Sequence, residues 1–395
     1  MHGAGLYTQH SEKSRLDSSY KVFKDNLFAR MKIRSGSYHV LYAFDIAFEI
    51  RLSQIPILFG DLQRDSARFS FLSRGIHRET QPVTMLAEPI TLEIQGRPVT
   101  FDLSFTFFDL GALSIEFMAP LETNDLQDLP RLANALHNSG ALASKARELA
   151  DSVSKRAHPA LVNAEVARAS SLFTVFNIQS HTGPVLVDDL IEQHGPQLAQ
   201  VLRGSEESIG FTEERRTLSL SVTYSDQDVV FASTNAALIF DETSSDVVDI
   251  FELANAQAVE LRYIDARLDR ALQALYEENE KRPSLWQRMT NVFELQIQKL
   301  NTMHLDTAII LDRVDNSFKF AQDSYLSQIH ELAIHKMFLK TFLQGIDRKL
   351  TSVREISSEL RDRATQSRME ILEWIVIVLI AIEVIPALLE KYGGH

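Results

Sequence analysis

A large apolar side chain occupies every second position from Tyr38 to Ile50. A period of two over that length predicts a β-strand with one buried side. Three similar runs follow, at residues 90–94, 99–107 and 113–117. Gly96 and Gly111 stand in the gaps between these runs, where a chain that reverses direction needs a turn. The pattern predicts an antiparallel β-meander.

Apolar residues repeat with a different period in the second half of the chain. Positions seven residues apart are apolar from Ala254 to Leu275 and again, after a break at Pro283, from Leu311 to Leu360. Such a repeat indicates left-handed coiled-coil helices. The second seam is mixed in character, so an intramolecular helical hairpin and a dimer both remain open.

The last long apolar run begins at Trp374, is interrupted by Glu383 and ends near Leu389. As a helix it spans about 24–28 Å, slightly less than a hydrocarbon core of about 30 Å. Arginines including Arg368 precede it, and positive residues remain on the cytoplasmic side. The pattern predicts a single-pass tail anchor in the bacterial inner membrane, with the N-terminal bulk in the cytoplasm.

Glu373 and Glu383 complicate that prediction, because an ionisable group in hydrocarbon is costly. Three interpretations stay open. Glu383 forms a hydrogen bond within a helix bundle, or it serves as a proton or ion site, or the helix is the buried part of a soluble oligomer.

The fold class expected from these patterns is α+β, with an antiparallel β-rich head, long coiled-coil helices and one C-terminal transmembrane helix. The predicted divisions are a basic flexible arm at 1–36, the α+β head at 37–245, the helical coiled-coil region at 246–368 and the tail anchor at 369–392.

Composition narrows the functional classes. The 395 residues carry a formal net charge of −13, which disfavours bulk binding to nucleic acid and specific recognition of DNA. The absence of cysteine excludes disulfides and thiol catalysis. Basic residues are concentrated at 11–34, so that the arm is either a solvated segment or a contact for RNA or anionic lipid.

Candidate chemistry is sparse. Gly-rich phosphate loops and the GxSxG nucleophile motif are absent, and His330 and His335 are spaced too far around a helix to bind one metal. The densest polar group lies at Arg262, Tyr263, Asp265 and Asp269. It is read as a charged helix face with ion pairs one turn apart, and a metal or acid–base role for the two aspartates is the alternative. No catalytic, cofactor-binding or metal-binding residue is predicted.

Two segments, Ala254–Asp269 and Arg368–Val384, resemble the required-for-meiotic-nuclear-division family, also called the YagE-like family. The resemblance implies a membrane-anchored protein without known catalysis. It also implies a link to translation, because mitochondrial members support translation at the inner membrane.

The expected function is therefore a non-enzymatic membrane scaffold or adaptor, with the lipid bilayer as one partner and an unknown protein or the ribosome as another. Self-association through the coiled coil is expected, and no cofactor. Two alternatives remain: a membrane-bound enzyme or ion-coupled device that uses the intramembrane glutamates, and a soluble coiled-coil oligomer.

Overall fold

The structure, a computed structural model, describes residues 31–392 with gaps at 75–80, 122–124, 165–168, 184–185, 226–227, 242–244, 281–291 and 318–322. Residues 1–30 of the predicted basic arm therefore lie outside the described residues. The chain forms two compact units. The first contains the described residues up to Glu260 and those from 323 to Leu339, and the second contains 261–317 and the rest of the chain from Lys340.

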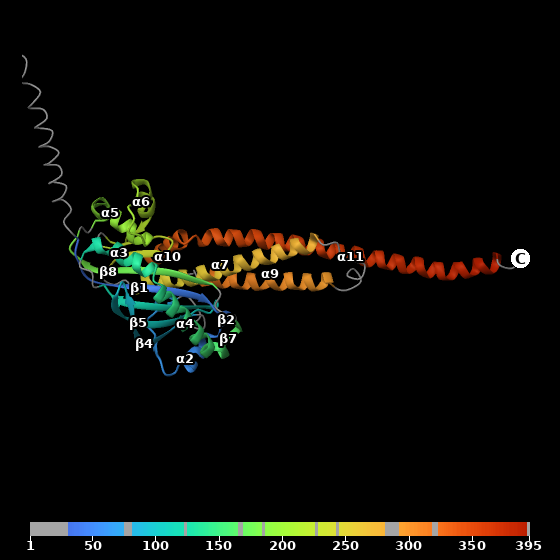
Figure 1. Cartoon of the computed structure of the whole chain (residues 1–395), viewed down its shortest axis with the longest axis horizontal. Helices are drawn as coiled ribbons and strands as arrows, with labels where there is room; N and C mark the ends of the chain where they lie inside the picture. The colour runs from blue at the N-terminus through green and yellow to red at the C-terminus, as the bar shows by residue number, and fades with distance from the viewer. Residues whose placement is uncertain are drawn as a thin grey trace, which may run out of the picture. The chain divides into compact units, whose positions relative to one another are not determined.

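A nine-stranded mixed sheet organises the first unit (Figure 1). Its strand order is β3-β4-β5-β6-β1-β8-β11-β10-β9, and β2 and β7 form a separate pair. The strands are β1 Ile33–Asp45, β2 Ala47–Ile50, β3 Gln63–Asp65, β4 Val83–Ile94, β5 Arg97–Phe107, β6 Ala112–Pro120, β7 Leu161–Ala164, β8 Ser170–His181, β9 Ser221–Val222, β10 Val229–Ala232 and β11 Ala236–Phe240. The helices are α2 Ile55–Leu58, α3 Leu129–His137, α4 Gly140–Ala157, α5 Val187–Arg203, α6 Phe211–Leu218, α7 Ser245–Glu280, α9 Val292–Ser317, α10 Ser324–Lys336 and α11 Leu339–Tyr392.

The predicted meander is present as β4, β5 and β6. Gln95 and Gly96 form the first turn with φ angles of 52° and 73°, the left-handed pair that a two-residue hairpin requires. Gly111 lies in the second turn at φ 107°, where an added Cβ would come within 1.9 Å of the backbone oxygen of Ala47. Glycine is thus required there for two reasons, the backbone angle and the close approach.

The two faces of the sheet are covered by different helices. Tyr38, Val40 and Tyr42 of β1 point to one face, where they join a core that includes residues of α3, α4 and α5. The intervening residues of β1 point the other way, because side chains alternate along a strand. On that second face Ala43 packs with Leu253 of α7, so the first half of α7 covers it.

The second unit is built from parts of α7, α9 and α11. Its buried residues lie along the three helices at helical spacing, among them Leu261, Leu268, Leu300, Ile346 and Val353. Arg267 of α7 pairs with Asp306 of α9 at 3.3 Å. The described part of this coiled-coil seam is therefore formed within one chain.

The long heptad run predicted from Leu311 to Leu360 is divided. Leu332 lies in α10, which contacts β9 and β10 of the sheet. The helix stops at Met337 and Phe338, and the φ of 59° at Phe338 is incompatible with a right-handed helix. A new helix, α11, then starts at Leu339.

The predicted fold class is wrong in two respects. The sheet is mixed and not simply antiparallel, since β8 and β11 run parallel and the chain between them supplies the crossover that parallel strands need. In addition, none of the helices described is both long enough and apolar enough to cross a membrane.

The second finding also overturns the predicted tail anchor, the inner-membrane location and the membrane-based description of the protein. The physical reason lies in the sequence of α11. Charged residues, among them Glu373 and Glu383, divide its apolar positions, and the uninterrupted stretch between them is short for a bilayer core.

Candidate functional site

A polar cavity of about 560 Å³ lies on the α7 face of the sheet, within the first unit. Strand register explains how it forms. Ser37 of β1 pairs with Asn177 of β8, and Glu116 of β6 pairs with Ser104 of β5. Residues directly opposite each other in a sheet point to the same side. The sheet therefore gathers four polar side chains from four strands at one place.

Close approach of β1 and β8 contributes to this geometry. An added Cβ at Gly36 would lie 2.5 Å from the backbone oxygen of Asn177. Only glycine lets the two strands lie this near each other, and the next residue along β1 is Ser37.

Glu116 is the central acid of the site and is 3% exposed. One carboxylate oxygen accepts a hydrogen bond from His39 Nδ1 at 2.7 Å. The other accepts from Arg68 at 2.6 Å and from the Ser104 hydroxyl at 2.8 Å. Burial alone would raise the pKa of Glu116, but the charge of Arg68 and the hydrogen bonds outweigh it and hold the pKa well below its usual range. Glu116 is therefore ionised at neutral pH.

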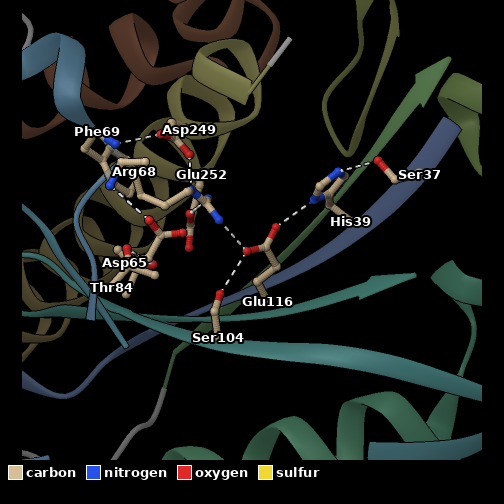
Figure 2. A network of polar contacts seen from close by, with 12 residues as sticks. Ser37, His39, Asp65, Arg68, Phe69, Thr84, Ser104, Glu116, Asp249 and Glu252 are labelled. Carbon is tan, nitrogen blue, oxygen red and sulfur yellow. Dashed lines mark hydrogen bonds and ion pairs between the residues drawn. The ribbon is translucent and has the colours of Figure 1, made fainter. Parts of the chain in front are cut away.

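Arg68 joins the sheet to α7, as Figure 2 shows. Its guanidinium contacts Glu116, Glu252 at 2.5 Å and Asp249, and the second oxygen of Asp249 accepts from the backbone N–H of Phe69 at 2.7 Å. Asp249 and Glu252 are fully buried. One guanidinium thus faces three buried carboxylates.

One positive charge cannot stabilise three buried negative charges. Burial raises the pKa of Asp249 to about 7, although the charge of Arg68 opposes the change. Burial and repulsion from Glu116 also raise the pKa of Glu252. Because Glu116 remains ionised, the two acids of α7 are the members of the cluster that burial favours in the protonated form.

Ser37 and His39 continue the chain of contacts away from Arg68. The two residues are two apart on β1, so their side chains share a face. The Ser37 hydroxyl lies 2.9 Å from His39 Nε2. An ionised Glu116 can only accept, so His39 carries its proton on Nδ1, and in neutral imidazole Nε2 then accepts from the Ser37 hydroxyl. The result is a serine–histidine–glutamate relay along the cavity wall.

Asn177 is the second informative residue. It lines the cavity, is 5% exposed, and its carboxamide oxygen has no hydrogen-bond partner among the described residues. An unsatisfied buried polar group costs about 1–3 kcal/mol. Such a cost is most easily understood where a bound molecule satisfies the group.

A second cavity of about 880 Å³ lies by the ends of β8 and β11 and the start of α10. Its lining is acidic, but the acids have structural partners. Asp228 accepts from the backbone N–H groups of Tyr224 and Ser225, and Asp323 caps the N-terminus of α10. Within the described part of the chain, no group of three or more potential ligand side chains could hold a metal ion.

The residues singled out from the sequence lie elsewhere, in the second unit. Arg262 stacks on Phe342 with 5.9 Å between its guanidinium carbon and the ring centre. Lys349 of α11 contacts Asp265 and Asp269 at 2.7 Å each.

The remaining predicted residues contribute nothing to the cavity. Tyr263 is partly buried in α7, whereas Glu373 and Trp374 are exposed on α11. Arg368 and Glu383 belong to α11, and their side chains lie outside the described part.

Fold and site together define a protein with a mixed-sheet head that carries a buried ionic cluster and a polar cavity. Residues 35–246 match the family described as the N-terminal domain of uncharacterized protein MJ0711, and the chain belongs to that family. The Methanocaldococcus jannaschii protein of that name is 21% identical over 218 residues, which cover 55% of this chain and 65% of the relative. The chain thus matches less than two thirds of the relative's length. No solved structure matches this chain.

The predicted membership of the required-for-meiotic-nuclear-division, or YagE-like, family is therefore wrong. That resemblance rested on segments of α7 and α11, where a heptad pattern and an apolar run are widely shared between unrelated helices. The matched region instead covers the sheet and includes Ser37, His39, Arg68, Glu116 and Asn177.

Proposed function

We propose that the head binds a small polar molecule in the cavity beside His39 and Asn177. The observation that carries this proposal is the Asn177 carboxamide, which faces the cavity at 5% exposure with its oxygen unpaired among the described residues. The cavity volume of about 560 Å³ falls in the range of small-molecule sites.

The lining indicates the chemistry of the ligand. The carboxylates of Asp65 and Asp102 offer acceptors, the hydroxyl of Ser37 offers a donor, and the carboxamide of Asn177 offers either a donor or an acceptor. Leu86 and Met118 add apolar surface. A molecule with several hydroxyl or amine donors on a short carbon frame fits this set.

Binding can be tested by thermal unfolding of the full chain against a panel of polyols, amino alcohols and small amines. A compound that binds raises the melting temperature of the wild type, and titration calorimetry then measures its affinity. Asn177→Leu removes the unpaired amide at nearly constant volume, so we expect affinity to fall about tenfold or more. Tyr224→Phe, which alters the other cavity, is the matched control and keeps the affinity. Equal affinity of the wild type and Asn177→Leu would contradict the proposal.

Self-association is a second candidate function, supported by α11. Leu372, Ile375, Leu379 and Ile382 follow the three–four spacing of a coiled-coil seam, and each is 50–64% exposed. Identical helices can bury such a seam against each other, so we propose a second copy of this chain as its partner. The coiled-coil oligomer without a membrane span is the alternative that this observation favours.

Sedimentation equilibrium of the full chain tests that candidate. The double variant Leu372→Ser/Leu379→Ser should reduce the assembly to single chains. Leu305→Ser, at an equally exposed leucine of α9, should leave the assembly unchanged. A wild type that sediments as one chain at about 0.1 mM would exclude the proposed seam. The absence of catalysis and the contact with a ribosome or another protein stay predictions.

A further inference from the structure

The relay in the cavity wall has the arrangement of an activated nucleophile. Ser37 Oγ lies 2.9 Å from His39 Nε2, and His39 Nδ1 lies 2.7 Å from a carboxylate oxygen of Glu116 (Figure 2). A serine becomes nucleophilic when an adjacent imidazole accepts its proton and an acid holds that imidazole in the correct tautomer. Triads of this kind are recognised by geometry and role, because they occur on unrelated folds.

The acid of the relay is unusually well held. Glu116 is fixed by Arg68 and Ser104 on one oxygen, which leaves the other oxygen for His39 alone. A carboxylate that stays ionised in a buried position stabilises the imidazolium that forms when His39 takes a proton. Arg68 is in turn anchored by two acids of α7, so the orientation of Glu116 does not depend on a surface contact.

Acyl transfer also needs a donor for the oxygen that becomes negative in the tetrahedral intermediate. Asn177 is the residue opposite Ser37 in the register of β1 and β8, and it faces the same cavity. Its carboxamide carries two N–H donors, and either end of the amide can face a ligand. Nucleophile, base, orienting acid and oxyanion donor thus lie on three adjacent strands.

We propose that Ser37 is the nucleophile of an esterase site, with His39 as general base, Glu116 as the orienting acid and Asn177 as the oxyanion donor. The substrate class is a carboxylic ester of a small polyol or amino alcohol that fits a cavity of about 560 Å³. This inference rests on the proposed binding cavity and adds a reaction to it. It also opposes the expectation from the sequence that the chain has no catalytic residue.

The reaction balances without a cofactor. His39 Nε2 takes the hydroxyl proton while Ser37 Oγ bonds to the ester carbonyl carbon. The bond from that carbon to the alcohol oxygen then breaks, and the leaving alkoxide takes the proton from Nε2. A water molecule attacks the acyl group by the same route, which releases the carboxylic acid and restores Ser37. No atom is oxidised or reduced.

A fluorophosphonate probe tests the proposal without knowledge of the natural ester, because it phosphonylates only activated serines. The full chain is incubated with the probe, and the labelled peptide is identified by mass spectrometry. We expect label on Ser37 of the folded wild type and none after heat denaturation. Ser37→Ala and His39→Gln should lose the label. Ser35→Ala, at an exposed serine of the same strand, should keep it.

The rate of labelling separates the roles further. Asn177→Leu should still react at Ser37, but about 10²-fold more slowly, as expected for loss of one oxyanion donor. Failure of the folded wild type to react, or equal labelling of Ser37→Ala, would overturn the esterase site. If a polar ligand still binds the wild type in that case, the binding function stands and only the reaction is excluded. Peptide mapping of the wild type decides the matter even if a variant does not fold.

Discussion

Asp249→Asn should change how the stability of the head depends on pH. Burial raises the pKa of Asp249 from 3.8 to about 7 in the folded protein. Above pH 4 the unfolded chain releases this proton while the folded chain keeps it. The stability contributed by the protonated acid therefore falls as pH rises, until the folded protein also ionises near pH 7.

The magnitude follows from the shift. One pKa unit corresponds to about 1.4 kcal/mol, so the wild type should lose roughly 2.5 kcal/mol between pH 5 and pH 7 relative to Asp249→Asn. Asparagine resembles the protonated acid and has no proton to release. Glu116 adds no slope in this window, because its pKa lies well below 4.5.

Three histidines also affect the measured pH profile of each protein. His181, His194 and His330 have pKa values lowered by burial, so the unfolded chain binds more protons than the folded chain below about pH 6.5. The stability that these histidines contribute to the folded protein rises with pH, which opposes the effect of Asp249. It is common to both proteins and cancels in the difference between wild type and Asp249→Asn, which reports Asp249 together with its interaction with Glu252.

Native-state hydrogen exchange, followed by mass spectrometry, is the suitable assay because it reports the opening free energy of each segment. Peptides from β1 and β6 are measured at pH 5, 6 and 7 and corrected for intrinsic exchange rates. Wild-type stability that falls by about 2.5 kcal/mol relative to Asp249→Asn between pH 5 and pH 7 agrees with the expected pKa. Parallel profiles, or a wild type that gains stability relative to Asp249→Asn as pH rises, would show that Arg68 keeps Asp249 ionised and would refute it.

Two further substitutions probe other parts of the fold. Gly111→Ala should destabilise the head by about 1–3 kcal/mol or more, because the added Cβ would clash with the Ala47 carbonyl at a residue with positive φ. Thermal unfolding measures this change in stability. A loss below about 0.5 kcal/mol would contradict the tight turn. Lys349→Met should cost about 0.5–1 kcal/mol in urea unfolding, since it leaves Asp265 and the more exposed Asp269 unpaired, whereas Lys349→Arg should keep most of the stability.

The sequence alone was sufficient to predict which side chains of β1 form one buried face of the sheet. The alternation after Tyr38 predicts the buried apolar side of β1, and Gly96 and Gly111 mark the turns of the meander. What covers the other side could not be predicted in this way. That covering is the first half of α7, more than two hundred residues further along the chain.

The site was missed for the same reason. In an antiparallel sheet the polar positions of an alternating strand are normally solvated, so Ser37 and His39 carry no signal of their own. A usable signal existed in α7, where Asp249, Glu252 and Asn255 recur every third residue within an otherwise apolar segment. Such a stripe needs buried polar partners, and the polar side of the meander provides them.

Local sequence patterns could not predict the parallel pairing of β8 with β11 or the break in the heptad repeat at Phe338. β8 and β11 are separated by two helices and two strands, and nothing near either strand specifies their direction. The heptad positions continue through Leu332 and Leu339, but the chain breaks at Phe338, between them. Packing of α10 on the sheet therefore overrides a repeat that would extend the helix.

The position of β1 in the sheet has a consequence for motion. This strand is the fifth of nine and is hydrogen-bonded to β6 on one side and β8 on the other. Its amides belong to the part of a fold that exchanges last, since opening them requires the loss of two strand pairings. Ser37 and His39 therefore lie on a strand that is held on both edges. A ligand that binds them meets groups already held in place, and little of its binding free energy is spent on ordering the protein.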